Sequence, residues 1–155
     1  MYSQAVDSTL EISKELQEHL VSLYFEWEQP WFQLVDETLF RESWNENGRY
    51  CNPLLLNCIF ALGSRYSDRT EVRSNPEDPN TAGQLFLELA EVLLHFDLKS
   101  PSIITIQSLA MMAILYVVSS SIKLHFLLIM FYFNYDYRQQ ALMPKVGYVM
   151  AWLFD

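Results

Sequence analysis

The feature of this sequence that most restricts its fold is a short, almost uninterrupted apolar run, Leu54–Leu62. Asn52 and Pro53 come directly before it, and these residue types are preferred at a helix N-cap and at the first helical position. A helix that is apolar on every side has to be buried on every side. The sequence therefore predicts a central helix with others packed around it. Gly63 and Ser64 are small enough to let one of these neighbours approach closely.

An amphipathic helix is predicted before this run, from about residue 9 to residue 28. Ser8 and Glu11 have the spacing of a capping box at its start, and Pro30 is expected to end it. Its apolar positions recur at intervals of three and four, as one face of a helix requires. These positions are Ile12, Leu16, Leu20, Leu23 and Trp27.

A short helix is predicted around Asp36 to Ser43, between the amphipathic helix and the central one. Asn45–Gly48 follows it and has the composition of a turn. After the central helix, Ser67 to Pro79 is polar and contains two prolines, so we expect a surface loop there.

Two more helices follow this loop. Asn80 and Thr81 are expected to cap the first, and Ser100-Pro101 starts the second, which runs to about Val118. The short connection between them favours antiparallel neighbours. The predicted inner face of the first consists of Leu85, Phe86, Leu89, Val92, Leu93 and Phe96.

The fold class that these elements predict is all-α. Glycine and proline are scarce, with 4 and 6 residues, which argues against a turn-rich β fold. We expect an antiparallel helical bundle that is an incomplete part of a larger helical domain.

The formal net charge of −9 restricts the binding partners of the chain. A nucleic-acid-binding domain needs a basic face that displaces counterions from phosphates. The chain has 10 basic and 19 acidic residues, and no cluster of Lys or Arg. We therefore expect these residues not to bind DNA.

No arrangement of residues points to catalysis or metal binding. Six residues separate Cys51 from Cys58, whereas paired zinc ligands usually have about two between them. Small core residues are the better interpretation of both. His19, His95 and His125 lack the helical spacing of a zinc protease. We predict no enzymatic activity, and no catalytic, cofactor-binding or metal-ligating residues.

Four carboxylates near Trp27 are the candidates for an acid–base pair. Glu26 and Glu28 flank this tryptophan, and Asp36 and Glu37 follow. On a helix, residues two apart point roughly 200° away from each other, so Glu26 and Glu28 do not converge. A solvated acidic face is the predicted arrangement.

The apolar stretch Ile103 to Val118 supports an alternative, a small membrane-associated helical protein that uses residues 103–133. With the serines after it, the stretch nearly reaches the roughly 20 residues that span a bilayer. A second apolar run, Ile122 to Phe133, follows. Against this alternative, Lys123 and His125 lie inside the second run, and no basic cluster marks a cytoplasmic flank.

Four segments, in this order, carry a family resemblance. They are Leu20-x-x-x-Tyr24-Phe25-x-Trp27-x-x-Pro30-Trp31-Phe32, Tyr50 to Ser67, Ala90 to Leu94, and Pro101 to Leu109. Together they resemble the fungal-specific transcription factor domain, the middle homology region of zinc-cluster transcription factors. In that family a His-Pro step is common where this chain has Gln29-Pro30.

The resemblance implies a nuclear protein that takes part in regulating DNA-templated transcription. It implies protein partners or dimerisation through the helices, and a small-molecule effector. Zinc and DNA binding belong in this family to an N-terminal cluster of six cysteines. That cluster is absent from these residues, so neither property is carried over to any of them.

The resemblance divides the chain into three parts. Residues 1–9 form an N-terminal lead, 10–118 the helices that resemble the regulatory domain, and 119–155 an atypical apolar insertion with a truncated continuation. Three interpretations of Ile122 to Phe133 stay open: a buried helix covered by the rest of the domain, a membrane-inserting segment, or a translated, unspliced intron.

Overall fold

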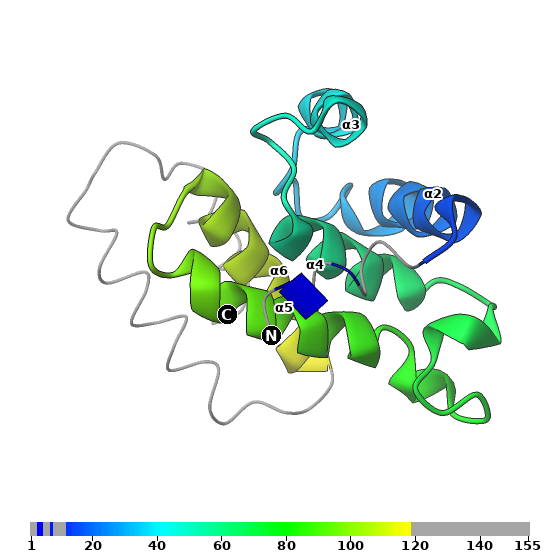
Figure 1. Cartoon of the computed structure of the whole chain (residues 1–155). Coiled ribbons are helices and arrows are strands. Elements are labelled where there is room, and N and C mark those ends of the chain that lie inside the picture. Colours follow the sequence, from blue (N-terminus) through cyan, green and yellow to red (C-terminus); the bar gives the residue numbers. More distant parts are fainter. Residues whose placement is uncertain (1–2, 5–6, 8–11, 119–155) are drawn as a thin grey trace, which may run out of the picture.

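The computed structural model describes residues 3–4, 7 and 12–118, and this part of the chain is helical (Figure 1). The predicted all-α fold is confirmed. The long helices are α2 (Lys14–Leu23), α3 (Glu37–Glu46), α4 (Pro53–Ser64), α5 (Gln84–Asp97) and α6 (Ile103–Val118). The short ones are the π-helix η1 (Tyr24–Glu28) and the 3-10 helices η2 (Thr70–Val72) and η3 (Pro79–Thr81). The apolar run at 122–133 lies outside the described residues.

Helix α4 is the central helix, as the sequence predicts. Asn52 caps it, because its side-chain oxygen accepts a hydrogen bond from the backbone N–H of Leu55 at 2.9 Å. Every residue from Leu54 to Ser64 is buried. Helices α2, α5 and α6 all contact α4, so the hydrophobic core surrounds it.

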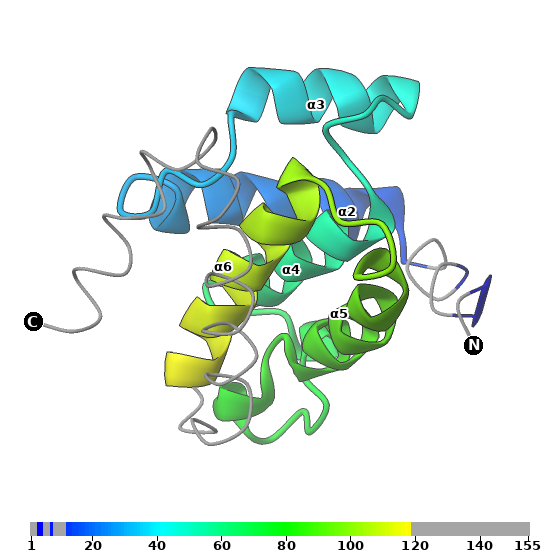
Figure 2. The ribbon, with the colours of Figure 1, turned by 90° about the vertical axis from the view of Figure 1, so that its left-hand side faces the viewer.

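Helices α2 and α5 run in the opposite direction to α4 (Figure 1). In Figure 1, α2 and α5 run toward the left of the view and α4 runs toward the right. Both views place α3 at the edge of the molecule, beyond α2 (Figure 2). Phe40 of α3 is fully buried, with its ring 5.6 Å from that of Phe25. This contact holds α3 against the bundle.

Two glycines allow the backbones of neighbouring elements to touch α4. A Cβ atom on Gly63 would lie 2.2 Å from the backbone oxygen of Leu20, so only glycine fits where α2 crosses α4. A Cβ on Gly83 would lie 2.4 Å from the backbone oxygen of Ala61. Gly83 also has a φ of 81°, which glycine adopts without steric cost. The predicted close approach at Gly63 is confirmed.

Helix α2 begins later than residue 9. Ser13 is its N-cap and accepts a hydrogen bond from the backbone N–H of Leu16 at 3.2 Å. Ile12 and Ser13 are not helical, so the predicted helix start is wrong. The first turn forms where a serine side chain can satisfy the free N–H groups. Ser8 and Glu11 lie outside the described residues.

The end of this helix differs from the predicted periodicity because α2 continues as the π-helix η1. The backbone N–H of Gln29 donates to the oxygen of Tyr24, five residues earlier, at 3.0 Å. A π-turn holds more residues than an α-turn, so the side chains within and after it shift around the axis relative to an α-helix. Glu28 is therefore buried, with 6% of its surface exposed, and Trp27 is 51% exposed. Both predictions, a buried Trp27 and a solvated Glu28, are wrong.

The start of α5 also differs from the prediction. Gly83 precedes its first residue, and Asn80 and Thr81 lie in the separate turn η3 instead of capping α5. The helix therefore starts later than predicted, and Leu85, in its first turn, is exposed instead of buried. The buried residues of α5 are Phe86, Ala90, Leu93 and Leu94. The predicted surface loop after α4 is mostly exposed, but its Val72 is buried.

Candidate functional site

The π-turn and the end of α4 together present an aromatic pair at the surface. The rings of Trp27 and Tyr66 are stacked, with centroids 6.3 Å apart and planes 20° from parallel. Both side chains are only partly covered. Trp31, four residues after Trp27, is 81% exposed. Large exposed aromatic side chains of this kind are the residue types that anchor protein contacts.

Glu28 fixes the position of one member of the aromatic pair, Tyr66, through a hydrogen bond. The hydroxyl of Tyr66 donates a hydrogen bond to the Glu28 carboxylate at 2.6 Å. Partial burial, and then the hydrogen bond and negative charge of Glu28, raise the pKa of Tyr66 to about 12. Tyr66 therefore stays neutral and bonded at physiological pH, and its ring is held in place beside Trp27.

The segment after α4 is tied to α2 by side chains. The Nε2 atom of His19 lies 3.0 Å from the hydroxyl oxygen of Ser67. Arg69 donates to the carboxylates of Glu15, at 2.5 Å, and Glu71, at 3.3 Å. The hydrogen bond from Arg69 lowers the pKa of Glu15. These contacts hold Tyr66 in the position where it meets Trp27.

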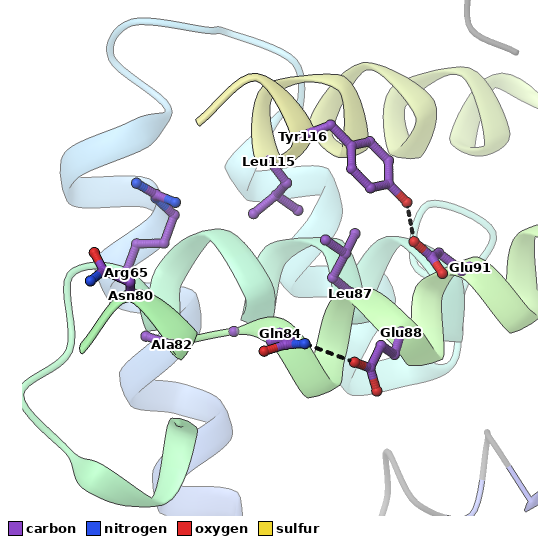
Figure 3. A pocket seen from close by; sticks show the side chains of 10 residues that line it. Arg65, Asn80, Ala82, Gln84, Leu87, Glu88, Glu91, Leu115 and Tyr116 are labelled. Carbon is purple, nitrogen blue, oxygen red and sulfur yellow. Dashed lines mark hydrogen bonds between the residues drawn. The ribbon is translucent and has the colours of Figure 1, made fainter. Parts of the chain in front are cut away.

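A pocket of about 410 Å³ lies between the end of α4, the turn η3, the start of α5 and the end of α6. Figure 3 shows Arg65 and Asn80 at one end, and Glu91 and Tyr116 at the other. Leu87 and Leu115 lie between the two ends. No pattern in the sequence indicates this site, because its walls come from segments far apart along the chain.

The two ends of the pocket differ in charge. Arg65 forms no ion pair with the residues that the structure describes. Gln84 donates to the carboxylate of Glu88 at 3.1 Å, and the hydroxyl of Tyr116 donates to Glu91 (Figure 3). Burial, and then the bond to Glu91, raise the pKa of Tyr116. The pocket therefore offers a cation at one end and two carboxylates toward the other.

The two cysteines lie in the protein core or at its margin. Cys58 is fully buried, and burial raises the pKa of its thiol to about 12. Cys51 is partly buried, and burial raises its pKa to about 12 as well. Across residues 12–118 no group of three or more His, Cys, Asp or Glu side chains is arranged to hold a metal ion. The His95 side chain is exposed, and His125 lies outside the described residues.

None of the helices in the described part of the chain combines the length and the apolar character needed to cross a membrane.

The family model of the fungal specific transcription factor domain matches residues 21–141, which is more than half of the chain. The chain belongs to this family. The resemblance that the sequence motifs indicate is confirmed. This is a family of transcription factors, and not of enzymes, with a role in the regulation of transcription.

Two relatives of this family member are nitrogen assimilation transcription factors. The chain is 31% identical to nirA of Emericella nidulans over 111 residues, 69% of this chain and 12% of the relative. It is 30% identical to nit-4 of Neurospora crassa over 106 residues, 62% of this chain and 10% of the relative. The chain therefore spans about a tenth of the length of these relatives. No solved structure matches it.

The segment around Pro30, which carries part of the family resemblance, forms the turn beside the aromatic pair. The hydroxyl of Tyr24 donates to the side-chain oxygen of Gln29 at 3.0 Å, and the Gln29 amide donates to the backbone oxygen of Val35. In the family, a His-Pro step is common at the position of Gln29-Pro30. Here the side chain of Gln29 joins the end of η1 to the segment before α3. The family match continues to residue 141, and the predicted boundary at 118 stays a prediction.

Proposed function

We propose that this chain is the regulatory region of a nuclear transcription factor, that it does not contact DNA, and that it acts through protein contacts. The observation that supports this most is the exposed aromatic pair on an acidic helical body of the fungal transcription factor family. Tryptophan and tyrosine dominate the binding energy of protein interfaces. The hydrogen bond from Tyr66 to Glu28 fixes one ring in advance, which reduces the entropy lost on binding.

The distribution of charge supports the absence of DNA contact. Binding to duplex DNA requires several Lys or Arg side chains free to neutralise phosphates. Of the arginines in the described residues, Arg41 and Arg69 already form ion pairs with carboxylates of this chain. With a net charge of −9, the chain repels a polyanion overall. DNA binding and zinc belong in this proposal to the six-cysteine cluster of the family.

The absence of DNA binding is tested by fluorescence anisotropy. The full chain is titrated into a labelled duplex at several salt concentrations that bracket the physiological value. We expect no increase in anisotropy, because no counterions are released from the phosphates. Micromolar binding that weakens steeply with added salt would contradict the proposal. A zinc-cluster DNA-binding domain with its operator serves as the positive control.

A further inference from the structure

We propose that the pocket between α4, α5 and α6 binds a small, elongated molecule with an acidic group at one end and an amine at the other. An apolar chain joins the two groups. The lining residues support each part of this description, from Arg65 at one end to the carboxylates of α5 at the other (Figure 3).

The acidic group of the ligand lies at Arg65. A guanidinium binds a carboxylate through two parallel hydrogen bonds, which gives both strength and orientation. Arg65 forms no ion pair with the described residues, so binding a ligand here does not require such a bond to break. Asn80 lies at the same end; its side-chain amide donates one hydrogen to Asp78 at 2.9 Å and has a second hydrogen to donate to a ligand.

The amine of the ligand lies at the carboxylates of α5. Glu88 and Glu91 are three residues apart on this helix, and both line the pocket. One oxygen of Glu88 accepts a hydrogen bond from Gln84, and a carboxylate can accept further bonds at its second oxygen. These two carboxylates favour a ligand with a cationic group at this end of the pocket.

The middle of the ligand is apolar. Leu87 of α5 and Leu115 of α6 lie between the two charged ends (Figure 3). Gln84 and Glu91 both line the pocket, and their separation of seven residues on α5, at 1.5 Å each, makes the lining extend over roughly 10 Å. An α-amino acid carries both charges on one carbon and does not extend over such a distance. An ω-amino acid, with a chain of methylene groups between its charges, does.

A ligand in this pocket would join three helices. It would connect the end of α4 and the end of α6 to the first turns of α5, and so stabilise the folded chain in proportion to its occupancy. This gives the proposed regulatory region a signal to respond to. The biological role of the ligand rests on the proposed function, whereas its binding is measured on the isolated chain.

The test is a calorimetric titration of the full chain with 4-aminobutanoate, 6-aminohexanoate and 8-aminooctanoate. Hexanoate and hexylamine serve as controls that each carry one of the two charges. We expect the best ω-amino acid to bind at least about fivefold more tightly than either control, since each half-exposed ion pair contributes modestly. It should also raise the melting temperature. No binding, or equal binding of all five compounds, would overturn the proposal.

Variants locate the site. Arg65→Gln and Glu88→Gln each remove one charge without removing the side chain, and each should weaken the best ω-amino acid about fivefold. Arg49→Gln and Glu77→Gln remove the same charges at positions outside the pocket lining and should leave binding unchanged. Circular dichroism verifies that all four variants fold. Equal affinity in all four places the ligand elsewhere and refutes the pocket. The DNA titration is a separate measurement, so failure of the proposed function is distinguished from failure of this one.

Discussion

Glu28 is a buried carboxylate with a structural role, because it accepts the hydroxyl of Tyr66 and holds that ring beside Trp27. Replacing it with alanine leaves the hydroxyl without its charged acceptor. We expect Glu28→Ala to lower the stability of the fold by about 1.5–3 kcal/mol, the range for a hydrogen bond to a charged group. Chemical denaturation measures this. Glu28→Gln keeps an acceptor oxygen and should lose less.

The same variant changes the titration of Tyr66. Its pKa is raised to about 12 in the folded chain, so folding favours the neutral phenol. The stability that this contributes is complete below the ordinary pKa of about 10 and is lost as the pH rises toward 12. In Glu28→Ala the pKa of Tyr66 should fall toward 10. Absorbance near 295 nm, measured against Tyr66→Phe, reports it. An unchanged pKa would mean that burial alone causes the shift.

Cys58 gives a second prediction at this scale. Its thiol is fully buried and its pKa is raised to about 12, so almost no thiolate exists at pH 8. We expect a thiol reagent to leave Cys58 unmodified in the folded Cys51→Ser variant and to react fully after unfolding. Rapid modification of the folded variant would show that α4 is not the centre of the core. Cys58→Ser, which retains the half-buried Cys51, is the comparison.

Among the helices, α4 could be predicted from sequence because its signals are local and agree. Asn52 and Pro53 mark the start, and an apolar run without a polar face requires burial on all sides. The turn η1 could not be predicted from the sequence. Pattern analysis assumes 3.6 residues per turn, and a π-turn breaks that period without any marker residue. The exposure of Trp27 and the burial of Glu28 both follow from this one turn.

The contact between α2 and α4 depends on Gly63. A Cβ atom there would lie 2.2 Å from the backbone oxygen of Leu20, and backbone cannot move aside as a flexible side chain can. We expect Gly63→Ala to destabilise the fold by about 1–3 kcal/mol, as overpacking of a core does. Thermal or chemical denaturation measures it. Leu85→Ala, at an exposed position of α5, should change stability by less than about 0.5 kcal/mol. Equal stability of the two variants would contradict the close approach of α2 to α4 at Gly63.

At the scale of the molecule, the fold class, the central helix and the family could be predicted from sequence, but the pocket could not. The motifs are contiguous, so they can be identified along the chain. The pocket has Arg65 from the end of α4, Glu88 from α5 and Leu115 from α6. Only the packing of those helices brings them together, and no spacing in the sequence encodes it.

The central claim is that this chain regulates transcription through protein contacts. The most direct test fuses the full chain to an unrelated DNA-binding domain and measures a reporter gene in fungal cells. We expect the fusion to change transcription relative to the DNA-binding domain alone. Trp27→Ala should reduce that change, and Leu85→Ala, at a position of similar exposure, should not. Ile59→Asp, which places a charge in the core, should abolish it. Output equal to that of the DNA-binding domain alone, or unaltered by Ile59→Asp, would contradict the claim.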